Sequence, residues 1–353
     1  MTQAEAPVLI EVRNRVGYLT LNRPAGLNAV TLPMVQLLHR QLQDWADDQE
    51  VAAVVLRGAG EKAFCAGGDI RSLYDSYQNG DSLHYAFFEE EYALDQYIHA
   101  YSKPLMALMN GFVLGGGMGL VQGASLRVIS ERTRMGMPEV GIGYFPDVGG
   151  SYFLPRLPGN CGIYMGLTGN HVGSADSLYA GLADYCVPHE HFSTLEKRLD
   201  EQDWASPAQE TLTRLASAMG STELPDAPFK ALFPAIETHF AHDSVAAICQ
   251  SLAQEDRPEY RDWAAETLKV IDSRSPLSVS VTLEMLRRGR TLSLAECFRM
   301  ELHLDRQWFD QGDIIEGVRA LIVDKDKNPR WNPPTLDEVT PQRVAAFFAD
   351  AGL

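Results

Sequence analysis

The segment from Asn110 to Arg156 carries the densest glycine cluster of the chain; it begins with NGFVLGGGMGL at 110–120 and ends with MPEVGIGYFPDVGGSYFLPR at 137–156. An apolar run, PLMALM at 104–109, precedes it and predicts a buried strand. Three glycines at 115–117 allow a tight turn, after which an apolar helix can begin. Such a turn leaves backbone N–H groups without intrahelical acceptors, and these N–H groups can stabilise developing negative charge.

Two isolated carboxylates, Glu139 and Asp147, follow in a segment that otherwise carries few charges. The pattern predicts that the glycine turn supplies an oxyanion donor and that the carboxylates supply acid/base chemistry. The structural alternatives are a simple packing turn at 115–117, a first-turn helix acid at Glu139 and a turn residue at Asp147.

Composition narrows the class of protein. The 353 residues are enough for about two domains. A net charge of −17 argues against nucleic acid or an anionic membrane as partner. We find neither a signal-peptide pattern nor an 18-residue apolar run, so we expect no membrane span. Five scattered cysteines indicate reduced thiols, and we expect a cytoplasmic protein.

Strand and helix patterns alternate through the first half of the chain. Residues 8–12 and 16–21 predict a hairpin, Thr31 predicts the cap of a helix, and residues 52–57 predict a buried strand. This order predicts an α/β fold. Helical patterns dominate from about Pro188. We therefore predict an α/β core at 1–200, which carries the site, and a mainly helical region at 201–353.

Two predicted helices carry acidic residues at informative positions. On the helix predicted to end near Ala100, Glu91 falls within the apolar stripe of Phe87, Leu94 and Ile98, and a buried carboxylate needs a partner such as an arginine. Near the carboxyl end, a capping box at 293–296 opens a helix with apolar positions at Phe298, Leu302 and Phe309.

Several common motifs are absent. The sequence has no G-x-G-x-x-G, no G-x-x-x-x-G-K-[ST], no G-x-S-x-G and no spacing typical of a metal site. We therefore expect no metal and no cofactor, and a chemistry that depends on backbone donors and on side-chain acids and bases.

The motifs as a set resemble a known family. KAFCAGGDI at 62–70, the glycine segment, the FPDVGG and YFLPRL motifs, and EGVRALIVDKDKNPRW at 316–331 are similar to the crotonase, or enoyl-CoA hydratase/isomerase, superfamily. Within it, the 3-hydroxyisobutyryl-CoA hydrolases are most similar, and the resemblance covers most of the chain. It implies a spiral of β-β-α turns with a helical carboxyl-terminal region.

The resemblance assigns roles to the catalytic candidates. It implies that the backbone N–H groups of Gly68 and Gly116 hold the thioester oxygen. Of the two hydratase glutamates, one matches Glu139, while the other falls at Gly119. Asp147 stands where hydratases usually carry glycine, as in the hydroxyisobutyryl-CoA hydrolases. Glu139 is then either a nucleophile or the general base for water, and Asp147 orients the acyl hydroxyl or water.

The resemblance also implies substrate contacts. These are Glu91, a loop at Asn28 and Ala29, the turn at Ala66, Asp69 and Ile70, and the lysine pair Lys325 and Lys327, which can meet CoA phosphates. Asp69 alternatively serves as a helix cap, and the lysine pair as a solvated face.

The resulting function is hydrolysis of a short 3-hydroxyacyl-CoA, with 3-hydroxyisobutyryl-CoA of valine breakdown as the expected substrate. The alternatives are enoyl-CoA hydration or isomerisation, and acyl-CoA binding without catalysis. An acyl-CoA substrate is the expected partner. The resemblance leaves a homo-oligomer open, because members often form trimers or dimers of trimers.

Overall fold

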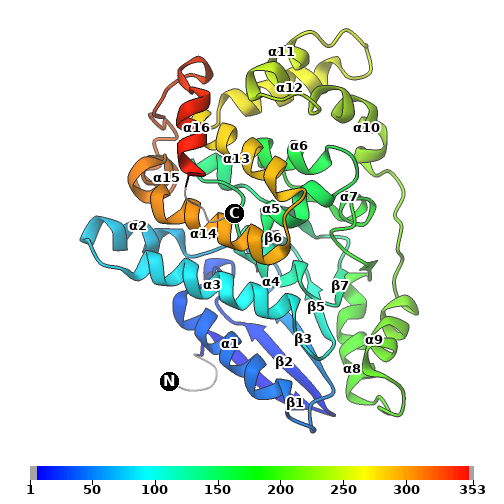
Figure 1. The fold of residues 1–353 in the computed structure, drawn as a ribbon. Coiled ribbons are helices and arrows are strands. Elements are labelled where there is room, and N and C mark those ends of the chain that lie inside the picture. The colour runs from blue at the N-terminus through cyan, green and yellow to red at the C-terminus, as the bar shows by residue number, and fades with distance from the viewer. Residues whose placement is uncertain (1–5, 350–353) are drawn as a thin grey trace. The chain divides into compact units, whose positions relative to one another are not determined.

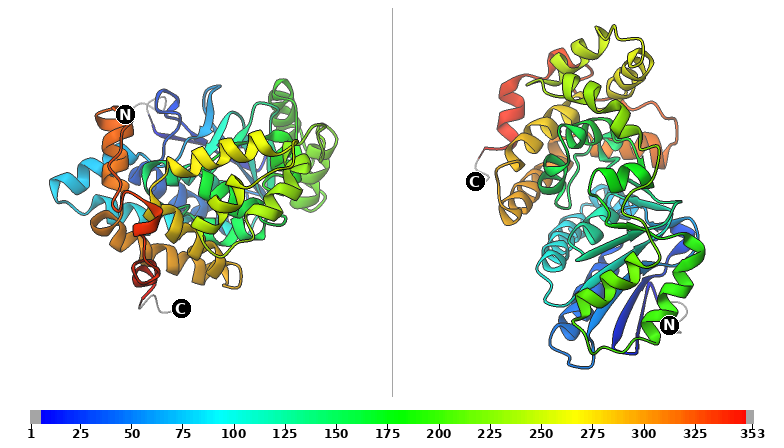
Figure 2. Two further views of the ribbon diagram at one scale, coloured as in Figure 1. Left: turned by 90° about the horizontal axis from the view of Figure 1, so that it is seen from above. Right: turned by 90° about the vertical axis from the view of Figure 1, so that its right-hand side faces the viewer.

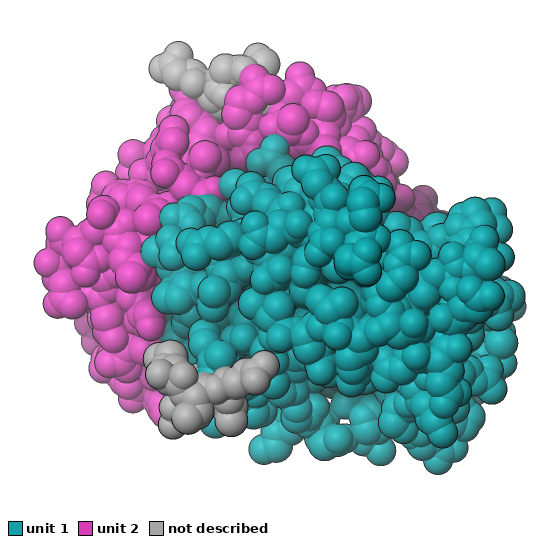
Figure 3. Space-filling view, turned by 90° about the horizontal axis from the view of Figure 1, so that it is seen from below, with its two compact units in different colours: residues 1–69, 90–135, 172–228 teal, residues 70–89, 136–171, 229–353 magenta. Residues whose placement is uncertain are grey.

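The computed structural model describes residues 6–349 (Figure 1). The chain divides into two compact units, drawn in two colours in Figure 3. Unit 1 comprises the described residues up to 69, together with 90–135 and 172–228. Unit 2 comprises 70–89, 136–171 and the described residues from 229 onward. The predicted domain division near residue 200 stays a prediction.

Unit 1 is built on a six-stranded sheet with the order β1-β2-β3-β5-β7-β10. β1 and β2 form the predicted antiparallel hairpin, and the other neighbouring strands pair in parallel. The strands are β1 Val8–Arg13, β2 Val16–Leu21, β3 Ala53–Gly58, β5 Leu105–Met109, β7 Leu126–Ile129 and β10 Tyr185–Cys186.

Helices pack against both faces of this sheet. Consecutive side chains of a strand point to opposite faces, so neighbouring residues of β2 contact different helices. Val16 and Tyr18 of β2 pack in a cluster with apolar side chains of α8 (Phe192–Asp200) and α9 (Ala208–Ser217). Gly17, between them, faces the other way: a Cβ there would lie 2.6 Å from the ring of Trp45 on α1 (Leu32–Ala46). Figures 1 and 2 show α8 and α9 beside the blue strands.

A smaller four-stranded sheet explains the spiral. Its order is β4-β6-β8-β9, with strands β4 Ala63–Cys65, β6 Phe112–Leu114, β8 Arg134–Gly136 and β9 Val172–Gly173. Each of β3, β5 and β7 joins the larger sheet, and the strand that follows it joins the smaller one. The β-β-α repeat therefore advances by one strand in both sheets per turn, and the expected α/β fold class is confirmed.

The remaining helices of unit 1 are short or shared. They are α4 Gly116–Gln122 and α7 Ser174–Tyr179; α3 Leu83–His99 continues from unit 2 into unit 1. Thr31 occupies the N-cap position of α1 as predicted, but its side chain makes no capping hydrogen bond. Leu38, Leu42 and Trp45 form part of the buried face of α1.

Unit 2 is mainly helical, as expected for the carboxyl-terminal region. Among the described residues, no helix of the chain is long and apolar enough to span a membrane. The helices of unit 2 are α2 Ile70–Asn79, α5 Gly150–Phe153, α6 Cys161–Thr168, α10 Pro228–His239, α11 Val245–Ala253, α12 Arg261–Asp272, α13 Pro276–Gly289, α14 Leu294–Gln311, α15 Ile314–Val318 and α16 Pro341–Phe347.

The longest helix, α14, begins with the predicted capping box of Ser293 and Glu296. Its buried face differs in part from the predicted one. Phe298 and Phe309 are buried as expected, but Leu302 is only partly buried. The face also contains two buried acids, described below.

Candidate functional site

Two glycine turns of unit 1 lie close together because the strands before them are neighbours. β4 and β6 pair in parallel, so their carboxyl ends meet at one edge of the smaller sheet. Gly68 follows β4, and Gly116 follows β6. A Cβ added at Gly116 would lie 3.4 Å from the backbone nitrogen of Gly68. The two nitrogens predicted to bind an oxyanion are therefore adjacent.

The N–H groups of both glycines lie outside the regular hydrogen-bond pairing. Gly116 is the first residue of α4, where N–H groups have no intrahelical acceptor. On either side of Gly68, hydrogen bonds run from Val30 N to Gly67 O (2.9 Å) and from Asp69 N to Val30 O (2.8 Å). Neither of these hydrogen bonds uses the N–H group of Gly68. Fixed donors of this kind can stabilise an oxyanion without reorganising during reaction.

The carboxylate of Glu91 borders the same turns. The side chain is buried, in line with the stripe predicted through Phe87, Leu94 and Ile98. A Cβ at Gly116 would lie 2.5 Å from Glu91 Oε1. A second buried acid, Asp95, lies one helical turn further along α3, and the stripe pattern could have revealed it. The role of Glu91 stays a prediction.

The loop at Asn28 forms one wall of a cavity in unit 1. Asn28 is fully buried, and its Nδ2 donates to the carbonyl oxygens of Ala59 and Ala63, at 2.9 Å each. The cavity has a volume of about 270 Å³ and is lined by residues of the segments 24–27 and 59–63. The side chain of Asn28 thus shapes the wall, while the substrate contacts of Asn28 and Ala29 stay predictions.

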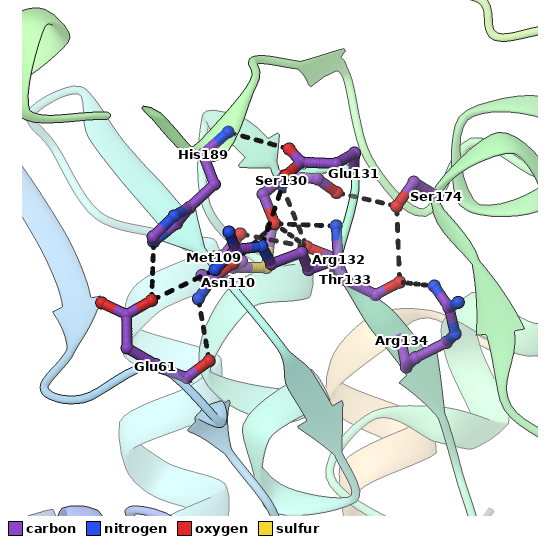
Figure 4. Close-up of polar contacts among 10 residues, drawn as sticks. All are labelled: Glu61, Met109, Asn110, Ser130, Glu131, Arg132, Thr133, Arg134, Ser174 and His189. Atoms are coloured by element: carbon purple, nitrogen blue, oxygen red, sulfur yellow. Dashed lines mark hydrogen bonds and ion pairs between the residues drawn. The ribbon is translucent and has the colours of Figure 1, made fainter. Parts of the chain in front are cut away.

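Lys62 brings a positive charge to this cavity. The preceding residue, Glu61, is held by several polar contacts (Figure 4). Glu61 Oε2 lies 3.2 Å from Arg132 Nη1 and 3.4 Å from His189 Nε2. The Glu61 carbonyl accepts a hydrogen bond from Asn110 Nδ2 at 3.1 Å. This network fixes the backbone that carries the exposed Lys62, which can meet a phosphate group. Lys62 was not predicted as a site residue, although it is the first residue of the KAFCAGGDI motif.

The predicted turn from Ala66 to Ile70 closes on the same loop. Ala66 N donates to Leu27 O at 3.0 Å. Asp69 directly precedes α2, at the position expected of a cap, and its carboxylate pairs with Arg23 Nη2 at 2.9 Å. This ion pair gives Asp69 a structural role, and its contact with substrate stays a prediction, as does that of Ile70.

In unit 2, Glu139 begins the short 3₁₀ helix η3 (Glu139–Ile142), directly after Pro138. Glu139 is 9% exposed, and its Oε2 has no hydrogen-bond partner among residues 6–349. Burial, and secondly the charge of Asp147, raise the pKa of Glu139 well above its ordinary value. A carboxyl group of this kind can exchange a proton closer to neutral pH.

Asp147 occupies a tight turn and is buried. Its carbonyl accepts a hydrogen bond from Gly150 N at 2.7 Å. Val148 and Gly149 are left-handed, with φ of 50° and 86°. The turn expected from Pro146-Asp147 is therefore present. The catalytic role of Asp147 stays a prediction.

Two further acids of unit 2, Glu301 and Asp305, were not predicted from the sequence. Both are fully buried on α14, one helical turn apart. Burial raises the pKa of Glu301 to about 8 and that of Asp305 well above its ordinary value, and the charge of Asp147 adds to both rises. The sequence could have indicated their burial, because both lie between Phe298 and Trp308 on the apolar stripe of the helix.

Lys325 and Lys327 lie in a turn after α15. Both are exposed and left-handed, with φ of 58° and 53°. Arg319 holds this turn through ion pairs with Asp324 and Asp326. Within residues 6–349, neither ammonium group forms an ion pair, so both can meet an anion, and their contact with CoA phosphates stays a prediction.

Each unit by itself carries groups that suit acyl chemistry. Unit 1 has paired backbone donors, which can bind an oxyanion, and a cation beside a cavity. Unit 2 has a carboxyl group of raised pKa, which can act as an acid or a base.

Known proteins of similar sequence act on CoA esters. The family model for enoyl-CoA hydratase/isomerase matches residues 16–348. The 3-hydroxyisobutyryl-CoA hydrolase of Danio rerio mitochondria is 41% identical, over 99% of this chain and 91% of its own length. The enzyme of the same name from Dictyostelium discoideum is 38% identical, over 97% and 91%.

Two solved structures are similar over nearly the whole chain. A carnitinyl-CoA dehydratase from Mycobacterium thermoresistibile has a TM-score of 0.90 and 37% identity, covering 98% of this chain and 97% of its own. An enoyl-CoA hydratase from Rhodobacter sphaeroides has a TM-score of 0.88 and 38% identity, covering 98% of both chains. On its sequence and its fold, the chain belongs to the enoyl-CoA hydratase/isomerase family.

Proposed function

We propose that this protein hydrolyses the thioester of a short 3-hydroxyacyl-CoA, with 3-hydroxyisobutyryl-CoA as its substrate. The products are 3-hydroxyisobutyrate and CoA, in the breakdown of valine. The observation that carries the proposal is the buried Glu139, whose pKa is raised by burial and by Asp147. The names of the Danio rerio and Dictyostelium discoideum relatives support it.

The reaction begins at the thioester carbonyl. The N–H groups of Gly68 and Gly116 bind its oxygen and stabilise the charge that develops there. Ionised Glu139 either attacks the carbonyl carbon or removes a proton from an attacking water. The bond between carbon and sulfur breaks, and the CoA thiolate leaves and is protonated. In the first route, water then hydrolyses the mixed anhydride.

The substrate's two ends have separate partners in this proposal. Asp147 orients the 3-hydroxyl group of the acyl chain or the attacking water, and Glu91 contacts the acyl end. The nucleotide end occupies the cavity beside Asn28 and Ala29, where Lys62 lies. No step uses a cofactor, and that expectation stays a prediction.

Hydration of an enoyl-CoA is the second candidate, because the two similar solved structures carry the names of a dehydratase and a hydratase. Against it stands position 119. The resemblance places the second hydratase glutamate there, and this chain has a buried glycine at that position of α4.

Release of free CoA thiol tests the proposal. The wild-type protein is mixed with 3-hydroxyisobutyryl-CoA, and hydration of crotonyl-CoA is followed in parallel. Thiol release without hydration supports the hydrolase, whereas hydration without thiol release supports the second candidate. Binding of both esters without turnover would support an acyl-CoA-binding protein.

Two other expectations stay predictions. The first is a cytoplasmic location; the names of the Danio rerio and Dictyostelium discoideum relatives place those proteins in mitochondria. The second is the oligomeric state, for which the resemblance leaves a homo-oligomer open and which sedimentation of the purified protein would test.

A further inference from the structure

Three residues on one face of helix α14 contact the segment 143–151, which includes Asp147. Trp308 Nε1 donates to Gly143 O at 2.8 Å, and the Tyr144 hydroxyl donates to Asp305 Oδ1 at 2.8 Å. Glu301 contacts the turn that follows Asp147. The three helix residues are spaced so that they share a face of α14, and all belong to unit 2 with the segment they contact.

Glu301 makes the densest of these contacts. Its Oε2 accepts from Gly149 N at 2.8 Å, and its Oε1 accepts from Ser151 N at 2.9 Å and from the Ser151 hydroxyl. The carboxylate is fully buried. One buried side chain thus satisfies two backbone donors on the far side of the Asp147 turn.

The turn needs such support because its backbone is strained. Val148 has φ of 50°, a conformation that a β-branched residue rarely adopts. Backbone of this kind persists where surrounding contacts over-determine it, and it is concentrated at functional sites. The strained residue directly follows Asp147, so the direction of the Asp147 side chain depends on the same turn.

We propose that Glu301 is a positioning residue, which fixes the Asp147 carboxylate for the reaction by holding the 147–151 turn through Gly149 and Ser151. The inference rests on the proposed function for its kinetic consequence, but its structural part stands on the hydrogen bonds of the turn. Glu301 itself touches no reacting atom in this account.

Asp305 offers a matched control. It is also fully buried on α14, one helical turn from Glu301, and its electrostatic field also reaches Asp147. Its hydrogen bond goes to the Tyr144 hydroxyl and not to the backbone of the turn. Glu301→Gln and Asp305→Asn each remove one buried carboxylate, but only Glu301→Gln places an amide NH₂ against a backbone N–H of the turn.

The experiment measures backbone hydrogen exchange in peptides that cover residues 145–153, together with kcat and KM for thiol release. In Glu301→Gln, exchange in these peptides should rise about 10-fold or more, because a backbone N–H of the turn then faces an amide NH₂ in place of an accepting carboxyl oxygen. The kcat should fall about 10- to 100-fold while KM changes less than about 3-fold. In Asp305→Asn, exchange in the turn and kcat should both stay within about 3-fold of wild type.

The outcomes separate this inference from the proposed function. Faster exchange in Glu301→Gln with no thiol release by the wild-type protein would leave the positioning role standing and overturn the hydrolase. Unchanged exchange and unchanged kcat in Glu301→Gln would overturn the positioning role, as would equal effects of the two variants.

A second variant covers the case in which Glu301→Gln does not fold. Ser151→Ala removes only the hydroxyl donor and leaves both backbone donors to Glu301. Exchange in the 145–153 peptides should rise about 2- to 5-fold, and kcat should fall by a similar factor. No change in either quantity would overturn the inference.

Discussion

The side chain of Glu91 leaves no room for a methyl group at Gly116. A Cβ at Gly116 would lie 2.5 Å from Glu91 Oε1, closer than real Cβ atoms approach other heavy atoms. A side chain at this position must therefore displace the Glu91 carboxylate, which lies beside the adjacent backbone nitrogens of Gly68 and Gly116.

Gly116→Ala should disable the oxyanion site. The added methyl group must displace Glu91 or the turn, so kcat for thiol release should fall about 10²- to 10³-fold. The control is Gly173→Ala, also in unit 1, where a Cβ meets only Arg134 at 3.6 Å or more. That variant should keep wild-type kcat. Equal kcat in both variants would contradict an oxyanion role for Gly116.

The pH dependence of kcat/KM should report on Glu139. Because burial and the charge of Asp147 raise its pKa, the activity should increase with pH through a value well above the ordinary glutamate range of about 4.3. Asp147→Asn removes the neighbouring charge, so the rising limb of the pH profile of kcat/KM should move to lower pH while the maximal rate falls. Asp75→Asn, at an exposed ion pair with Arg71, should leave the limb unmoved. A limb that stays in place in Asp147→Asn would argue against the coupling.

Stability should also change with pH through Glu139. A carboxyl group whose folded-state pKa is raised stabilises the fold below its unfolded pKa, and that stability is lost as pH rises through the folded pKa. Glu139→Gln does not titrate. The variant should therefore gain free energy of unfolding relative to wild type between pH 5 and pH 8, by about 1 kcal/mol or more. Urea unfolding at the two pH values measures this; a difference that is independent of pH would refute it.

Lys62→Ala should weaken recognition of the nucleotide end. Loss of a cation beside the cavity should raise KM for the CoA ester about 3- to 10-fold, more strongly at low salt, with little change in kcat. The matched substrate is the N-acetylcysteamine thioester of the same acid, which lacks the phosphates. Its KM should not respond to the substitution. An equal rise for both thioesters would show that Lys62 acts on the acyl end or on the fold.

How far the sequence could predict the site depends on periodicity. The 3.6-residue repeat through Phe87, Leu94 and Ile98 places Glu91 on the buried face, and the structure confirms its burial. On α14 the apolar residues alone suggest a stripe through Leu302, which is only partly buried. The true face includes the acids Glu301 and Asp305, which an apolar pattern passes over.

Other features were out of reach because they depend on tertiary contacts. The left-handed backbone at Val148 contradicts the local preference of valine, and Glu301, more than 150 residues away in sequence, satisfies the donors next to it. The strands β9 and β10 have two residues each, too few for a periodic pattern. The proximity of Gly68 to Gly116 follows from the pairing of β4 with β6, which no local pattern encodes.

The most direct test of the central claim is the rate of CoA thiol release from 3-hydroxyisobutyryl-CoA by Glu139→Gln. The variant keeps the size of the side chain and removes its ability to act as nucleophile or base. We predict that kcat falls about 10³-fold or more while the variant stays folded and still binds the ester. Thiol release within about 10-fold of the wild-type rate would contradict the account, because the hydrolysis would then not depend on Glu139.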